Sequence, residues 1–142
     1  MLVSAKTEYA CIAVLELAAR HARGEPVRIR EIADAHGIPS RFLVQILLQL
    51  KSAGLVQSVR GASGGYRLAR EPDEITLLDV MTVVDAQLGP AATSATRNTA
   101  TTRVLQRTWK DVAAKERELL EEVTFAGLVE RLKGAPEGMY YI

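Results

Sequence analysis

Arginine, serine and glycine residues that suit an anionic ligand gather between residues 58 and 65 of this 142-residue chain. Arg60 stands directly before the run GASGG. Glycines let the backbone approach a phosphate closely, and an arginine beside them can enter a narrow minor groove. The pattern therefore predicts contact with a nucleic acid. The candidate contact residues in this segment are Ser58, Arg60, Gly61, Ser63, Gly64 and Gly65.

Two other interpretations of the glycine run stay open. A nucleotide-phosphate loop ends in lysine followed by serine or threonine and leads from a strand into a helix. Here the run is followed by Tyr66 and a strand-like segment, which disfavours that interpretation. The other alternative is a tight hairpin in which Arg60 is an incidental surface charge.

A second set of polar residues recurs at helical spacing between residues 40 and 51. Arg41 can make a pair of hydrogen bonds to the edge of a guanine, and Gln45 can make a pair to the edge of an adenine. Each pair is worth about 1 to 3 kcal/mol of discrimination against the wrong base. Ser40 and Lys51 belong to the same predicted helix face. Arg28 and Arg30 precede it, where phosphate contacts are expected. The alternative is that these residues are ordinary solvated positions.

The elements that would position both sets follow from the apolar pattern. Five apolar residues at three- and four-residue spacing predict one buried helical stripe, namely Phe42, Leu43, Ile46, Leu47 and Leu50. Gly54 would end this helix, and apolar residues on both sides of the glycine run predict a hairpin. A helix followed directly by a basic, glycine-tipped hairpin is the outline of a winged helix-turn-helix, which binds duplex DNA.

The same blocks resemble a known family. IPSRFLVQIL, LKSAGLVQSVRG, GGYRLAR and EPDEITLLDV occur in the order and spacing of the Rrf-two type of bacterial winged-helix regulators. TEYACIAVLELAA and VTFAGLVERL are also similar, so the resemblance covers nearly the whole chain except residues 87 to 103. It implies a homodimeric transcription factor, but not the signal sensed. Many relatives carry glutamate at the position of Val44, so a different operator preference is expected.

Some members of that family bind an iron-sulfur cluster, but this chain is not expected to bind one. In cluster-binding relatives three cysteines near residues 87 to 103 ligate iron and sulfur, whereas this chain contains only Cys11. Because a cluster needs mostly thiolate ligands, neither a cluster nor another metal is expected. Glu8 and His36 lie near places where some relatives supply a non-cysteine ligand, yet they are interpreted as ordinary polar residues. Cys11 is interpreted as a small core residue rather than a reactive thiol.

The net charge of +1 conceals an uneven distribution. Residues 1 to 27 carry three basic and three acidic side chains. Residues 28 to 70 carry seven basic and two acidic side chains, and residues 71 to 142 carry eight basic and twelve acidic ones. The middle segment is therefore +5 and the last −4. Since screening acts over about 8 Å at physiological salt, the local charge governs attraction to phosphate. The middle segment is expected to face DNA.

Length and composition exclude several other classes. A chain of 142 residues suits one domain with a real core. It has no apolar run of about 18 residues and no secretory pattern at its start, so a cytoplasmic location without a membrane span is expected. No catalytic triad, Cys-His pair or carboxylate cluster is visible, and only two histidines occur, so an enzyme is not expected.

The remaining segments predict a mainly α fold with a small β-hairpin wing. Expected helices run from Ser4 to about Arg23, over 30–36, over 77–86, over 102–122 and over 125–133, with a short strand at 27–29. Residues 1–86 are expected to form the winged helix-turn-helix domain and residues 87–101 a flexible loop. Residues 102–142 would hold a dimerisation helix and a C-terminal helix within the same integrated domain.

The helix expected over 102–122 carries a narrow apolar seam. Its members are Leu105, Trp109, Val112, Leu119 and Val123, with Glu116 as the one polar member. A short domain that exposes such a seam has a ready partner in a second copy of itself. Trp109 would be an interface anchor, although a place in the intramolecular core is the alternative.

The combined prediction is a homodimeric transcriptional regulator, acting as a repressor. Two copies would bind a near-palindromic duplex operator with their recognition helices about 34 Å apart. A small-molecule or protein effector would control the dimer. The alternative is a protein-interaction module on the same fold that has lost DNA binding.

Overall fold

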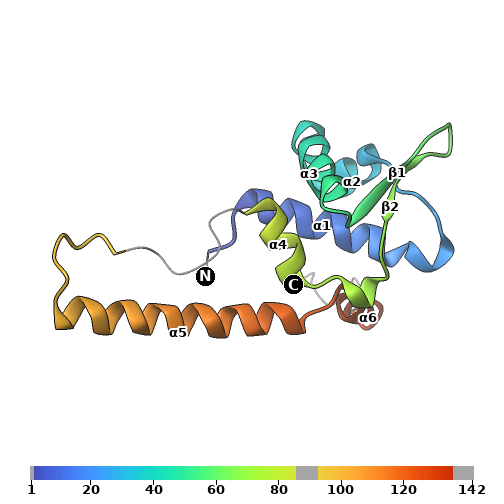
Figure 1. Cartoon of the computed structure of the whole chain (residues 1–142). Helices are drawn as coiled ribbons and strands as arrows, with labels where there is room; N and C mark the ends of the chain where they lie inside the picture. The colour runs from blue at the N-terminus through green and yellow to red at the C-terminus, as the bar shows by residue number, and fades with distance from the viewer. Residues whose placement is uncertain (1, 86–92, 136–142) are drawn as a thin grey trace, which may run out of the picture.

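The computed structural model describes residues 2–85 and 93–135 as a mainly helical fold with one hairpin (Figure 1). The elements in chain order are α1 (Ala5–Ala19), η1 (His21–Arg23), α2 (Ile29–His36), α3 (Ser40–Ser52), β1 (Val56–Val59), β2 (Gly65–Leu68), η2 (Pro72–Glu74), α4 (Leu77–Val84), α5 (Ala100–Glu122) and α6 (Phe125–Lys133). The two strands are antiparallel. The predicted fold class is confirmed.

Side-chain caps begin three helices where the sequence indicates. The hydroxyls of Ser4, Thr76 and Thr124 each accept a hydrogen bond at 3.1 Å from a backbone N–H one turn into α1, α4 and α6. Asp79 returns the bond by accepting from the Thr76 N–H at 2.9 Å. Such a cap typically stabilises a helix by about 1 kcal/mol, so these three boundaries are encoded locally.

Other boundaries differ from those predicted. Helix α1 ends at Ala19 instead of Arg23, α4 ends at Val84 instead of Ala86, and α5 begins at Ala100 instead of residue 102. The chain after α1 tightens into a 3₁₀ turn that Gly24 closes with φ 64°. The Thr99 hydroxyl caps α5 by accepting from the Thr102 N–H at 3.2 Å, which explains its earlier start.

The strand expected at residues 27–29 is reduced to one residue pair. Val27 forms a single antiparallel bridge with Tyr66, while α2 already begins at Ile29. The peptide N–H of Arg28 donates to the Glu31 carboxylate at 3.5 Å, as expected at the start of a helix. Helix formation therefore competes successfully with strand extension at this point.

Helix α1 lies at the centre of the body and packs against α3, α4, α6 and β2. The largest buried side chains of this core include Leu17, Leu43, Ile46, Leu47 and Phe125. Four of the five residues of the predicted α3 stripe are buried, whereas Phe42 is 40 % exposed. Because Phe125 of α6 is fully buried, the last helix shares one core with the first.

Helix α5 extends away from this body, and its N-terminal end lies far from the other helices (Figure 1). Its C-terminal part packs against α4, and Leu120 is its one buried residue. Part of the predicted loop, residues 86–92, lies outside the described residues, and so does the end of the chain after residue 135. The described part of the loop, residues 93–99, contains neither helix nor strand.

Backbone hydrogen bonds fix the place where α5 leaves the body. The N–H of Leu77 donates to the carbonyl of Val123 at 2.9 Å, and the N–H of Phe125 donates to the carbonyl of Ile75 at 2.9 Å. Thr76 and Thr124 form an antiparallel bridge between these two bonds. The start of α4 is therefore tied directly to the junction of α5 and α6.

The core position of Phe125 gives a stability prediction. Phe125→Ala removes a side chain with 0 % exposure and should lower the free energy of unfolding by about 3 to 5 kcal/mol, measured by urea denaturation. Leu132→Ala on the same helix is the control, because Leu132 is 50 % exposed and should change the value by about 0.5 kcal/mol or less. Equal losses in both variants would contradict this account of the core.

Candidate nucleic-acid interface

The outward face of α3 carries the residues of this helix that were predicted to contact DNA. Ser40, Arg41, Gln45 and Lys51 are all exposed, as are Val44 and Leu48 between them. Leu43, Ile46, Leu47 and Leu50 on the opposite face are buried against the core. The helical period thus divides α3 into a packed face and a free face.

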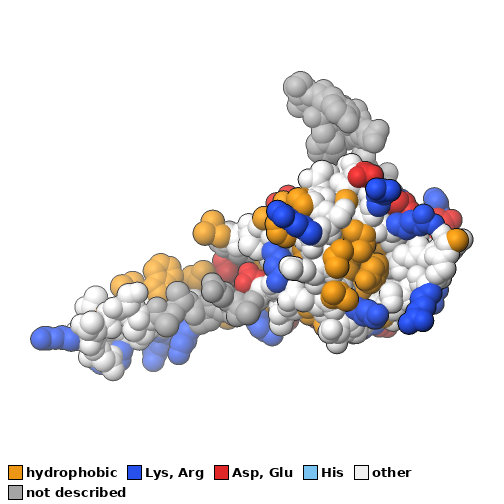
Figure 2. All heavy atoms as spheres, turned by 90° about the horizontal axis from the view of Figure 1, so that it is seen from above, with side chains coloured by type: hydrophobic (Ala, Val, Ile, Leu, Met, Phe, Trp, Pro, Cys, Tyr) orange, Lys and Arg blue, Asp and Glu red, His pale blue; other side chains and the backbone are white. Residues whose placement is uncertain are grey.

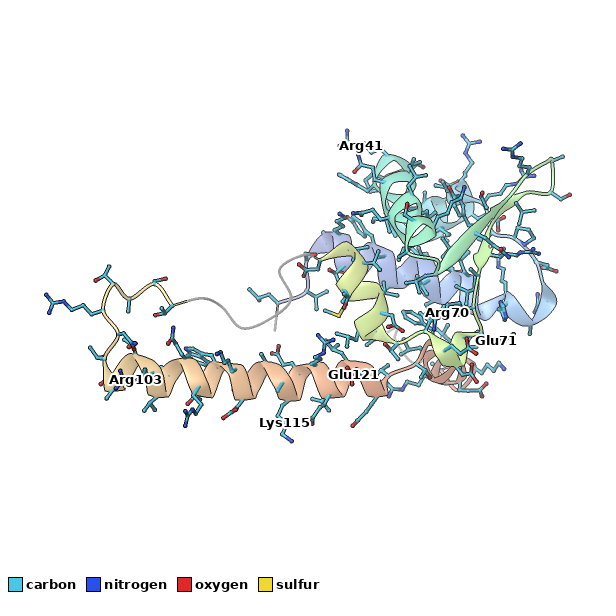
Figure 3. The ribbon with its side chains drawn as sticks, viewed as in Figure 1. Arg41, Arg70, Glu71, Arg103, Lys115 and Glu121 are labelled. Atoms are coloured by element: carbon cyan, nitrogen blue, oxygen red, sulfur yellow. The ribbon has the colours of Figure 1, made fainter. Side chains whose placement is uncertain are left out.

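Arg41 is oriented by an aromatic ring that the sequence pattern assigned to the core. Its guanidinium lies 5.0 Å from the centre of the Phe42 ring, which is itself 6.2 Å from the ring of Tyr9 in α1. Figure 3 shows Arg41 projecting from the outer end of α3. An arginine stacked on an aromatic ring keeps its charge and its donors while losing freedom of movement. The stacking on Phe42 thus orients the Arg41 guanidinium, whose donors stay free to bind a planar group such as a base edge.

The hairpin of β1 and β2 projects from the body as a wing (Figure 1). Its register runs from Val56 opposite Leu68 to Val59 opposite Gly65. Arg60 follows β1 directly, is exposed, and contacts no carboxylate among the described residues. Arg60 is therefore exposed beside the wing tip, and no described carboxylate pairs with it.

Two glycines of the wing have a structural role. A Cβ atom at Gly64 would lie 2.2 Å from the Val59 carbonyl oxygen, and one at Gly65 would lie 2.6 Å from that of Val27. Gly64 is also buried. These two glycines allow the hairpin to close and to pack against Val27, and their contact with DNA stays a prediction. Gly61 and Ser63 are exposed.

Two residues predicted to contact DNA, Arg28 and Lys51, also contact the wing. The Arg28 guanidinium donates a hydrogen bond to the carbonyl of Ala62 at the wing tip. The Lys51 ammonium donates to the Ser58 hydroxyl at 3.0 Å. The wing is therefore connected to both α2 and α3. Neither contact has a signal in the local sequence pattern, because each joins residues of different elements.

Basic side chains dominate the side of the molecule that carries α3 and the wing. Figure 2, which looks onto this side, shows Lys and Arg side chains around the rim of the body and hydrophobic side chains near its centre. Glu31, one of two acidic residues between 28 and 70, pairs with Arg20 at 2.7 Å. The hydrogen bond from Arg20 lowers the pKa of this carboxyl group. The pairing offsets one of the few negative charges near the interface.

One of the candidate metal-ligating residues, His36, pairs with a carboxylate of another helix. His36 Nε2 lies 2.8 Å from Glu16 Oε1 and so connects α2 to α1. Cys11 is half-buried against the core, and burial raises the pKa of its thiol to about 11. A thiol with so high a pKa is a poor nucleophile and a poor ligand near neutral pH. The described residues contain no group of three or more His, Cys, Asp and Glu that could hold a metal ion.

Most of this chain matches a known protein family. Residues 3–131 match the family model Rrf2, described as an iron-dependent transcriptional regulator. The chain belongs to the Rrf2 family. It is 32 % identical over 143 residues to the HTH-type transcriptional regulator CymR of Bacillus subtilis, covering 100 % of both chains. It is 34 % identical over 131 residues to the HTH-type transcriptional regulator IscR of Aliivibrio salmonicida, covering 91 % of this chain and 77 % of that protein.

Two solved structures agree with this assignment. CymR, the global cysteine regulator of B. subtilis, superimposes with a TM-score of 0.76 at 31 % identity, covering 92 % of this chain and 98 % of that one. T. potens IscR superimposes with a TM-score of 0.77 at 33 % identity, covering 99 % of this chain and 97 % of that one. This Rrf2 protein is a transcriptional regulator with DNA as its partner, and not an enzyme. None of its described helices is long and apolar enough to span a membrane.

The iron dependence in the family description does not fit the thiols of this Rrf2 protein. The chain supplies a single cysteine, and an iron-sulfur cluster is held mainly by several thiolates. That cysteine is half-buried on α1, with its pKa raised by burial. The chain therefore has too few thiols to hold such a cluster.

The exposed charge of Arg60 gives a prediction for binding. Arg60→Ala should weaken binding to duplex DNA and lower the slope of log K against log salt by about one, because one cation no longer displaces a counterion. Arg70→Ala is the control, since Arg70 follows the wing and pairs with Glu74 at 3.9 Å. Fluorescence anisotropy over a salt series measures both. An unchanged slope in Arg60→Ala would contradict the placement of Arg60 on DNA.

Proposed function

We propose that this Rrf2 protein is a homodimeric repressor that binds a near-palindromic operator. Each copy would insert α3 into a major groove, with the two helices about 34 Å apart, and lay its wing along the neighbouring backbone. Arg41 and Gln45 would contact base edges, while Arg60, Gly61 and Ser63 would contact the minor groove or its phosphates. The observation that carries this proposal is the exposed apolar seam on α5.

The seam is uncovered within the described residues. Leu105, Trp109, Val112 and Leu119 are between 47 % and 64 % exposed, so Trp109 does not belong to an intramolecular core. Val123 is half-buried at the joint with α4 and lies apart from this exposed set. Figure 2 shows hydrophobic side chains along one side of α5 and basic ones along the opposite side. A second copy of the chain would cover such a seam with an identical surface.

The charges along α5 support an antiparallel pairing. Residues 100–111 carry three basic side chains and one acidic, whereas residues 112–122 carry two basic and four acidic. Arg103 lies at the free end of the helix and Glu121 at the end near the body (Figure 3). An antiparallel arrangement sets the basic half of each helix against the acidic half of the other, whereas a parallel one opposes like charges.

Control by an effector would act through this dimer. Occupation of the operator excludes other proteins from the same DNA, which makes repression the proposed output. A small molecule or partner protein would change the spacing of the two α3 helices by binding better to one arrangement of the dimer. Such an effector can shift the equilibrium only by its difference in affinity for the two arrangements.

The dimer proposal gives a prediction for Trp109. Trp109→Ala should weaken self-association at least about thirtyfold, because a central interface tryptophan typically contributes about 2 kcal/mol or more. Sedimentation velocity over a concentration series measures the change. Thr108→Ala, next to it on α5, is the control and should associate like the unchanged protein. A wild-type protein that stays monomeric throughout would refute the dimer.

The base-reading proposal gives a prediction for Arg41. Selection from a pool of random duplexes should enrich a near-palindromic site, and Arg41→Ala should relax one position in each half of it, at a cost of about 1 to 3 kcal/mol. Lys133→Ala on α6, a solvated residue that pairs with Glu130 at 3.1 Å, should keep the full preference. Failure of the wild-type protein to enrich any site would favour the protein-interaction alternative.

A further inference from the structure

We propose that Arg28 is a positioning residue, which fixes the wing tip and thereby the place of Arg60, instead of binding phosphate itself. Its guanidinium donates to the carbonyl of Ala62, two residues beyond Arg60 and 34 positions away in sequence. The part of this inference that concerns DNA rests on the proposed function. The part that concerns the order of the wing does not.

The wing needs support from outside. Each of its strands has four residues, and an isolated two-stranded hairpin is marginally stable in water. Within the tip, the Gly64 N–H donates to the Gly61 carbonyl at 3.0 Å, which closes the turn but does not set its direction. The hydrogen bond from Arg28 is the described contact that connects the tip to the body.

The base of the wing is held by the residue before Arg28. Val27 and Tyr66 exchange two backbone hydrogen bonds of 2.8 Å each, and the missing side chain of Gly65 makes room for Val27. Because Val27 is fixed on the wing and Ile29 begins α2, the backbone of Arg28 has little freedom. Its side chain therefore starts from a fixed point when it reaches the tip. Two successive residues thus support the wing at its base and at its tip.

The chemistry of the side chain fits this role. A guanidinium offers five N–H donors in a rigid fork, so it can bond a backbone carbonyl without neutralising its charge. Among the described residues no carboxylate contacts the Arg28 side chain. Arg30 carries the same charge two positions on, is exposed, and contacts neither the wing nor a carboxylate in the described part of the chain. Arg30 is therefore the matched control.

The first experiment tests the wing without DNA. Backbone ¹⁵N order parameters of residues 61–64 are measured in the full-length protein, in Arg28→Ser and in Arg30→Ser. Serine is a good helix N-cap, so the start of α2 is kept, and Arg28→Gln serves as a second substitution. The order parameters at the tip should fall from about 0.85 towards 0.6 in the Arg28 variants only. Unchanged values would overturn the proposal.

The second experiment separates positioning from phosphate contact. Arg28→Ser should weaken binding to the selected operator about tenfold, and the loss should shrink to less than about twofold in an Arg60→Ala background, because coupled residues are not additive. An undiminished tenfold loss in that background would show an independent phosphate ligand and overturn the proposal. If the wild-type protein binds no duplex, the proposed function fails, and the order parameters still decide whether Arg28 fixes the wing.

Discussion

The burial of one face of α3 against α1 is the constraint on which the rest of the structure depends. Leu43, Leu47 and Leu50 are fully buried, so the rotation of α3 about its own axis is fixed. The opposite face must then point to solvent, which places Arg41 and Gln45 outward. A turn of the helix by one residue, about 100°, would bury polar groups and expose leucines at a cost of several kcal/mol. The packing of the core thus determines which side chains of α3 are exposed and able to contact DNA.

The wing illustrates the opposite situation, in which little apolar burial is available. Only Val56 and Leu68 of its strands are buried, and the tip contains no large apolar residue. Its position is set instead by polar contacts with two neighbouring segments, through Val27 and Arg28 before α2 and through Lys51 of α3. Each such contact contributes about 1 kcal/mol, so the place of the wing depends on a few individual hydrogen bonds.

The sequence was sufficient for the elements whose causes are local. The apolar period of α3, its glycine stop and the caps Ser4, Thr76 and Thr124 depend on residues within one turn of each other. The roles of Phe42, Gly64 and Arg28 could not be predicted, because each depends on an atom of another element or of a folded loop. Phe42 has the spacing of a core residue, yet it lies at the edge, where it supports Arg41. The period of the apolar residues gives no information about polar residues whose partners are distant in the sequence.

The position of α4 explains how a distant signal could reach α3. Helix α4 packs against α1, α3 and α5, and its first residue is joined to Val123 by a backbone hydrogen bond. A change in the angle of α5 would therefore move α4, which packs against α3, the helix proposed to contact base edges. In the proposed dimer the two α5 helices are the shared element, so a small change in their crossing alters the separation of the two α3 helices. Since paired major grooves accept only a separation of about one helical turn, such a change is enough to weaken operator binding.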